Sequence, residues 1–139
     1  MNTVEKTTYD DTGKLLLRLV LALFILCHGV SKLMHGITGI TAMVTSAGLP
    51  EIFANLVYVG EVLAPLLILV GVWTRPAALV IVVNMIVALL LAHTSQFFTL
   101  SQSGGWALEL QGFYLATAFV VALLGAGRFS LGGLQGKWN

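Results

Sequence analysis

Residues 15–34 read LLLRLVLALFILCHGVSKLM, and this run decides the class of the protein. A helix needs about 20 mostly apolar residues to cross the hydrocarbon core of a bilayer, and the run has that length. It nevertheless carries Arg18 and Lys32. A charge at membrane depth costs on the order of 2.5–3.5 kcal/mol even on the mildest insertion scale. The run therefore predicts a membrane helix whose charged residues have a functional role.

The composition of the whole chain supports the same class. Of the 139 residues, 58% are hydrophobic and only 9% are charged, whereas about a quarter of the residues of a soluble domain are charged. The mean hydropathy is +0.94. The net charge of +1 argues against a nucleic-acid partner, because phosphate binding needs a concentrated basic surface. The lipid bilayer is therefore the first partner we expect.

Further segments of the chain have the length and apolarity of membrane spans. Beside Leu15–Met34 they are Glu51–Val72, Pro76–His93 with an extension as far as Phe98, and Trp106–Gly125. Backbone groups in lipid must be hydrogen-bonded within the segment, so such continuous runs are helices. We predict an all-α integral membrane four-helix bundle formed by residues 15–128. Residues 1–14 then form a polar cytoplasmic N-terminal segment, and residues 129–139 a short cytoplasmic tail.

The connections between the spans differ in length and character. Proline disfavours helix in the residue before it, so Arg75 before Pro76 is expected to form a tight turn between antiparallel spans. Apolar residues alternate with threonines in residues 35–50 at a spacing that predicts a short amphipathic helix lying in the membrane interface. Residues 94–105 are rich in Ser, Thr, Gln and Gly and are expected to form a loop.

The basic residues outside the spans predict the orientation. One side of the predicted bundle holds all of them, namely Lys6, Lys14, Arg75, Arg128 and Lys137. The positive-inside rule then places both termini and the Arg75 turn on the cytoplasmic side. We therefore expect a multi-pass protein of the inner membrane. Trp73 and Trp138 fall at the inner boundary and Trp106 at the outer one, as expected of aromatic residues at the two interfaces.

Polar side chains within the spans mark the candidate site. At 100° per residue, Arg18, Ile25, His28 and Lys32 lie on one face of the first span. At a rise of 1.5 Å per residue, most of the polar groups fall in the outer half of the bundle, whereas Arg18 lies near the inner side. We predict a polar pocket there formed by His28, Lys32, Glu61, His93 and Glu109, with Arg18 and Asn84 as supporting groups.

Simpler interpretations of the same residues stay open at this point. Lys32 and Arg18 have side chains long enough to reach the headgroups from near the ends of the span. Asn84 has the character of a helix–helix contact in lipid, and Glu109 has the depth to pair with Lys32. Glu61 is too short and too deep to reach water, so it is protonated, paired or part of a polar cavity.

Several of these stretches together resemble the DoxX family, over about residues 13–133. They are LLLRL (15–19), HGVSKL (28–33), GLP (48–50), Gly60-Glu61, GVWTRP (71–76), His93, Glu109 and GAGRFSL (125–131). The resemblance implies a small bacterial or archaeal membrane protein with four helices and a link to quinone redox chemistry. One member is described as a subunit of a terminal quinol oxidase. Related members are associated with thiosulfate:quinone oxidoreductase, and others with membrane complexes that manage oxidative stress. Members often end in Ser-Leu-Asp, where this chain has Ser130-Leu131-Gly132.

Three functions are compatible with these residues. The first is a quinone- or quinol-interacting accessory subunit, because His28, Lys32 and Glu109 are suited to bind a quinone carbonyl and Glu61 to relay a proton. The chain encodes no dinucleotide loop and no cysteine set for an iron–sulfur cluster, so a partner would supply electrons. A bound quinone is the one cofactor we expect, and no metal site is predicted. Whether the chain is itself an enzyme stays open.

The other two functions are alternatives from different classes. A scaffold or assembly subunit would use small residues such as Gly60 and Ala64 for close helix contacts with another membrane subunit or a second copy. A small-molecule or copper-handling protein would use the soft ligands Cys27, His28 and Met34 with His35 near the end of the first span.

Overall fold

The computed structural model describes residues 3–133, 136, 138 and 139, and these residues form an all-α structure with a single isolated β-bridge. Three helical segments are long and apolar enough to cross a membrane: Thr8–His35, Glu51–Val70 and Thr74–Ala92. A further apolar helix, Glu109–Leu124, is shorter. The expectation of a helical membrane protein is confirmed.

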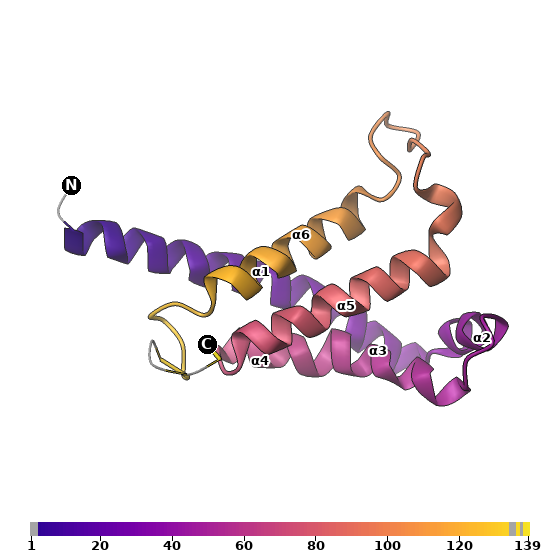
Figure 1. Cartoon of the computed structure of the whole chain (residues 1–139), viewed down its shortest axis with the longest axis horizontal. Helices are drawn as coiled ribbons and strands as arrows, with labels where there is room; N and C mark the ends of the chain where they lie inside the picture. The colour runs from indigo at the N-terminus through magenta and orange to yellow at the C-terminus, as the bar shows by residue number, and fades with distance from the viewer. Residues whose placement is uncertain (1–2, 134–135, 137) are drawn as a thin grey trace.

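The first helix is longer than the sequence predicts. Helix α1 runs from Thr3 to His35, so most of the polar segment expected over residues 1–14 continues the helix of the first span. Its first turns project beyond the ends of the other helices (Figure 1). The polar side chains do not stop the helix, because nothing between Asp10 and Lys14 is a helix breaker as strong as proline.

A short helix follows the first span, as predicted for residues 35–50. Helix α2 covers Thr38–Ser46, and Ala47 is its C-cap residue. A turn at Gly48, which has a positive φ of 80°, leads on to Pro50. Helix α2 packs against the start of the next segment and against the third span. It therefore covers one side of the space between those two segments, close to where they diverge in Figure 1.

The second apolar segment is one continuous rod made of several helix types. A 3₁₀ segment η1 (Glu51–Asn55) leads into α3 (Leu56–Tyr58), a π-helical turn η2 (Val59–Leu63) and α4 (Ala64–Val70). Pro65 explains the wide turn, because it has no N–H for the carbonyl of Glu61, four residues before it. Single π-turns within helices are frequently found at functional sites.

The rod ends at a glycine, and the next helix begins almost at once. Gly71 has a φ of +72°, its N–H bonds to the carbonyl of Ile68 at 3.1 Å, and the N–H of Val72 reaches the carbonyl of Leu67 at 3.0 Å. This pattern is a Schellman motif, which requires a left-handed residue. Trp73, with a φ of +49°, completes the reversal.

The prediction that Arg75 forms the turn is wrong, because α5 runs from Thr74 to Ala92 and includes it. Proline is tolerated in the first turn of a helix, where the backbone N–H groups have no helical partner. Pro76 therefore fits within α5 rather than before it.

After α5 the chain forms the predicted loop. It contains a 3₁₀ turn η3 (Thr94–Gln96) and an isolated bridge between Leu100 and Trp106. Helix α6 then covers Glu109–Leu124, three residues later at its start than the predicted Trp106. The indole N–H of Trp106 donates to the carbonyl of Phe97 at 2.8 Å, which holds this tryptophan on the loop.

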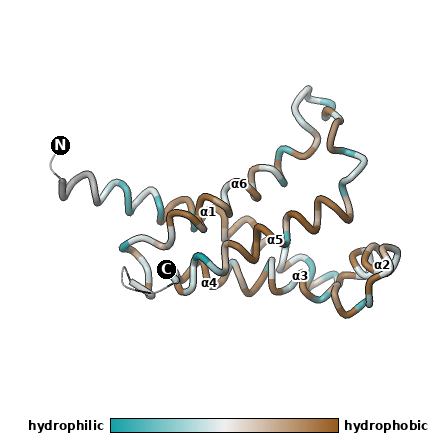
Figure 2. Tube along the Cα trace, in the orientation of Figure 1, coloured by the Kyte–Doolittle hydropathy of each residue, from teal (hydrophilic) through white to brown (hydrophobic). Residues whose placement is uncertain are grey.

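The core lies where four helices meet. Helix α5 packs against α6 and α4, and α1 packs against α4 and α6. The side chains between them are apolar and almost fully buried, including Leu21, Ile25, Ile68, Ile81 and Val121. Large apolar residues also cover the outside, among them Phe24, Leu90 and Phe113, and Figure 2 shows the hydrophobic colouring along α5 and α6. An apolar exterior of this extent fits contact with lipid.

Candidate functional site

A buried carboxylate on the π-turn is the centre of the site. Glu61 is only 6% exposed, and its Oε2 forms an ion pair with the Nζ of Lys32 on α1. Its Oε1 accepts a longer hydrogen bond of 3.5 Å from the Nδ2 of Asn84 on α5. Three helical segments therefore contribute to one polar trio, and the buried charge of Glu61 is balanced by a cation.

Two glycines allow these segments to approach one another. A β-carbon on Gly29 of α1 would overlap the backbone carbonyl oxygen of Glu61 and would lie 2.7 Å from its carbonyl carbon. A β-carbon on Gly60 would lie 2.5 Å from the Cγ of Asn84. The carbonyl of Glu61, which Pro65 leaves without its usual α-helical donor, is the group that Gly29 faces.

A cavity of about 680 Å³ lies beside the trio. Ile40 and Met43 of α2, Phe53 of η1 and Val80 and Val83 of α5 form part of its largely apolar wall. The polar side chains of the wall are Lys32, Glu61, Asn84 and His93. We call this space the large cavity. Its volume lies within the range of typical ligand sites, and an apolar wall with a few polar groups is their usual composition.

A second cavity of about 170 Å³ adjoins the same ion pair. His28, Gln111 and Tyr114 line it together with Lys32 and Glu61, which line both cavities. The ion pair therefore forms part of the wall of each cavity. The rings of His28 and Tyr114 meet edge to face with 5.9 Å between their centroids. We call this space the small cavity.

His93 belongs to both cavities and is held by two amide side chains. Its Nδ1 lies 3.1 Å from the Oε1 of Gln96, and its Nε2 lies 3.4 Å from the Nε2 of Gln111. The first contact comes from the loop after α5 and the second from α6. His93 is therefore fixed where α5, the loop and α6 meet.

Five of the predicted site residues are brought together, and Glu109 is not. Those that gather around the cavities are His28, Lys32, Glu61, Asn84 and His93. Glu109 is exposed and lines neither cavity; its Oε1 accepts a hydrogen bond of 3.0 Å from the backbone N–H of Trp106. Trp106 lies before α6, which begins at Glu109, so this contact ties the end of the loop to the first residue of the helix. The alternative in which Glu109 pairs with Lys32 is wrong, because Lys32 pairs with Glu61.

Arg18 also lies apart from the cavities and lines neither of them. It is 2% exposed, and its guanidinium donates to the backbone carbonyls of Ile68, at 3.0 Å, and of Phe129. The prediction that Arg18 supports the pocket is therefore wrong. So is the alternative in which its side chain reaches the headgroups, because the side chain is buried within the protein. The left-handed backbone of Gly71 makes room for it, because a β-carbon there would overlap the guanidinium.

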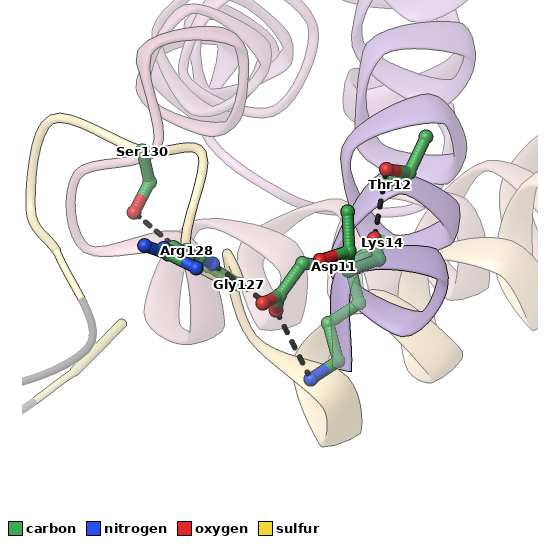
Figure 3. A network of polar contacts seen from close by, with 7 residues as sticks. Asp11, Thr12, Lys14, Gly127, Arg128 and Ser130 are labelled. Atoms are coloured by element: carbon green, nitrogen blue, oxygen red, sulfur yellow. Dashed lines mark hydrogen bonds and ion pairs between the residues drawn. The ribbon is translucent and has the colours of Figure 1, made fainter. Parts of the chain in front are cut away.

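A buried aspartate near the start of α1 holds the same C-terminal segment. Asp11 is 4% exposed, and its Oδ1 accepts a hydrogen bond of 3.2 Å from the backbone N–H of Arg128. The same oxygen lies 3.9 Å from the Nζ of Lys14, and Figure 3 shows the carboxylate between these two partners. The segment after α6 is thus fixed to α1 at two points, Asp11 and Arg18.

Comparison with known proteins identifies the family. The family model for DoxX matches residues 13–94, which is more than half of the chain. The chain belongs to the DoxX family. No curated protein and no solved structure matches the chain. The DoxX match contains the polar trio and both histidines of the cavities, and it ends before Glu109 and before α6.

Two residues of the small cavity were missed by the sequence interpretation. Gln111 and Tyr114 lie on α6, outside the range of the DoxX match. They are three residues apart, the spacing at which side chains share one face of a helix. That spacing, together with the apolar surroundings of both residues, is the signal that points to them.

The copper alternative gains no support from the geometry of this DoxX protein. Among the described residues, no three His, Cys, Asp or Glu side chains gather in a way that would hold a metal ion. Cys27 on α1 is exposed and lines neither cavity.

Proposed function

We propose that the chain is a quinone- or quinol-binding accessory subunit of a membrane oxidoreductase. The observation that carries the proposal is the large cavity, whose apolar wall contains the trio of Lys32, Glu61 and Asn84. A quinone combines a ring that bears carbonyl oxygens with a long apolar tail. Lys32 and Asn84 supply donors for a carbonyl oxygen, and the residues of α2 and α5 supply an apolar surface for the tail.

Glu61 is the group we assign to proton exchange with the bound ring. Reduction of a quinone consumes protons at its oxygens, and oxidation of a quinol releases them, so a titratable group beside the ring is required. Glu61 lines both cavities, and the small cavity contains His28 and Tyr114. A partner subunit supplies or accepts the electrons, because the chain itself carries no residue set for an electron carrier.

The proposed setting is a four-helix bundle in the inner membrane with both termini in the cytoplasm. The mutual contacts of α1, α4, α5 and α6 support the bundle, and the distribution of Lys and Arg supports the orientation. Helix α6, with 16 residues, spans about 24 Å. The residues that flank it, Trp106–Leu108 and Gly125, would complete the crossing.

The test is mass spectrometry of an organic extract from the protein purified in native-lipid nanodiscs. The wild type is expected to contain about one quinone per chain, and Glu61→Gln is expected to lose it. Glu109→Gln is the matched control, because it makes the same chemical change outside the cavities. Val80→Trp, which fills the large cavity and leaves the ion pair in place, is expected to lose quinone as well.

Each outcome of this experiment decides something. Equal quinone in the wild type, Glu61→Gln and Val80→Trp would overturn binding in the large cavity. A folded wild-type protein without quinone would also overturn the proposal, and would favour the scaffold function instead.

A further inference from the structure

The large cavity carries its charges in a neutralised form. The ionisable residues in its wall are Lys32, Glu61 and His93. The positive charge of Lys32 is paired with the negative charge of Glu61. Both ring nitrogens of His93 face uncharged amides, those of Gln96 and Gln111. The wall therefore presents no net formal charge to a ligand when His93 is neutral.

The trio still offers hydrogen-bond donors to a ligand. An ammonium group has three N–H donors and an amide nitrogen has two. Glu61 accepts one from the Nζ of Lys32 and one from the Nδ2 of Asn84. The remaining N–H groups on these two side chains are suited to an oxygen that accepts hydrogen bonds. An ether, ester, ketone or quinone oxygen has this property without a charge.

An anionic head group would be repelled by the Glu61 carboxylate. Its charge would lie close to the Glu61 carboxylate, in surroundings of low polarity where like charges repel strongly. Lys32 does not compensate for it, because Glu61 already neutralises the ammonium group. A buried charge without its own counter-ion is disfavoured. The ion pair thus discriminates against anions although it contains a lysine.

We infer that the large cavity selects amphiphiles with a neutral, hydrogen-bond-accepting head group over anionic amphiphiles of the same chain length. This inference rests on the proposed function in that the cavity holds an amphiphile. It adds the class of head group and the cause of the selection. Biological membranes contain anionic lipids in quantity, and discrimination against anions would keep such lipids from competing for the cavity. Glu61 causes the selection because its carboxylate neutralises the ammonium group of Lys32.

The test compares two ligands with equal chains, tritiated methyl hexadecanoate and tritiated hexadecane sulfonate, by equilibrium binding to the purified full-length protein. The sulfonate stays ionised throughout the usable pH range. The wild type is expected to bind the ester at least about tenfold more tightly, which corresponds to about 1.4 kcal/mol. In Glu61→Gln the preference is expected to reverse, because Lys32 is then an unpaired cation.

Two further variants keep the result independent of folding defects. Glu109→Gln is expected to retain the wild-type preference, because Glu109 lies outside the cavities. The exchanged pair Lys32→Glu with Glu61→Lys is expected to retain it too, because the pair stays neutral. Equal binding of both ligands, or tighter binding of the sulfonate, by the wild type would overturn the inference alone. Binding of neither ligand by the folded wild type would also overturn the inference, whereas the proposed function is overturned separately, by a wild type that contains no quinone in the nanodisc extract.

Discussion

Gly29 of α1 lies directly against the backbone carbonyl of Glu61, with no room for a β-carbon between them. The contact fixes where α1 crosses the second helical rod. Lys32 follows Gly29 by three residues, on the adjacent turn of α1 and on the same side, so its ammonium reaches the carboxylate of the residue whose backbone Gly29 contacts. One close backbone contact therefore sets the register of the ion pair.

The first prediction concerns this contact. Gly29→Ala is expected to destabilise the protein by about 1–3 kcal/mol, because the added methyl group must push the two helices apart. Gly13→Ala is the control on the same helix. A β-carbon there has nothing within 4 Å, so the exchange should be neutral or stabilising by up to about 1 kcal/mol through helix propensity. Thermal unfolding in detergent measures both, and equal melting temperatures would contradict the assigned contact.

The second prediction is an asymmetry between the two halves of the ion pair. Lys32→Met leaves the buried Glu61 carboxylate without a cation and is expected to cost about 3 kcal/mol, the low end of the range for a broken buried pair. Glu61→Gln leaves Lys32, whose side chain is 26% exposed, and is expected to cost only about 1 kcal/mol, since the ammonium can turn toward water.

The double variant Lys32→Met with Glu61→Gln provides the control for this asymmetry. It is expected to be more stable than Lys32→Met alone, because no unpaired charge is buried. Unfolding of the four proteins in denaturant gives the coupling energy. Additive effects of the two single exchanges would show that the side chains do not interact.

The third prediction concerns Arg18. Arg18→Met leaves the carbonyls of Ile68 and Phe129 without their donor, so the segment after α6 is expected to detach from α1. Hydrogen–deuterium exchange of residues 126–133 should then be faster by about tenfold, which corresponds to the loss of about 1.4 kcal/mol of protection. Lys14→Gln is the control, because Lys14 is partly exposed and its contact with Asp11 is long at 3.9 Å. Unchanged exchange in Arg18→Met would contradict the assigned role.

The fourth prediction separates the large cavity from the lipid-facing surface of the same helix. Val80→Trp is expected to reduce the amount of bound neutral amphiphile by more than about half, because the indole group fills space in the cavity. Leu90→Trp on α5 adds an indole group at an exposed position that does not line the cavity and should leave binding unchanged. Binding assays on both variants, with melting temperatures as a check on folding, measure the difference.

The sequence predicted the positions of the apolar helices and most of the residues that gather in the site. Depth along a helix follows from a constant rise per residue, so His28, Lys32 and Glu61 were correctly expected near one another. Rotation and crossing of helices do not follow from that rise. They depend on the contact at Gly29 and on the π-turn before Pro65, which is why the sequence named only Glu109 as a partner for Lys32 and left the state of Glu61 open.

The errors at Arg18 and Glu109 have local causes. Arg18 looked as if it were able to reach water from near the end of a span, but α1 continues toward the N-terminus and the segment at Phe129 covers the guanidinium. Glu109 looked buried because the fourth span was expected to begin at Trp106. The helix begins at Glu109 itself, and its exposed carboxylate accepts the backbone N–H of Trp106 in the preceding loop.

The attachment of Arg18 to Phe129 has a consequence for how the protein is made. These residues are 111 positions apart, so α1 emerges from the ribosome long before the carbonyl that completes its arginine site. During that interval the guanidinium needs water or lipid headgroups in place of its final partners. The first helix is therefore expected to stay shifted toward the membrane surface nearer Arg18 until the segment at Phe129 has been made, and to reach its final depth only when that segment folds against it.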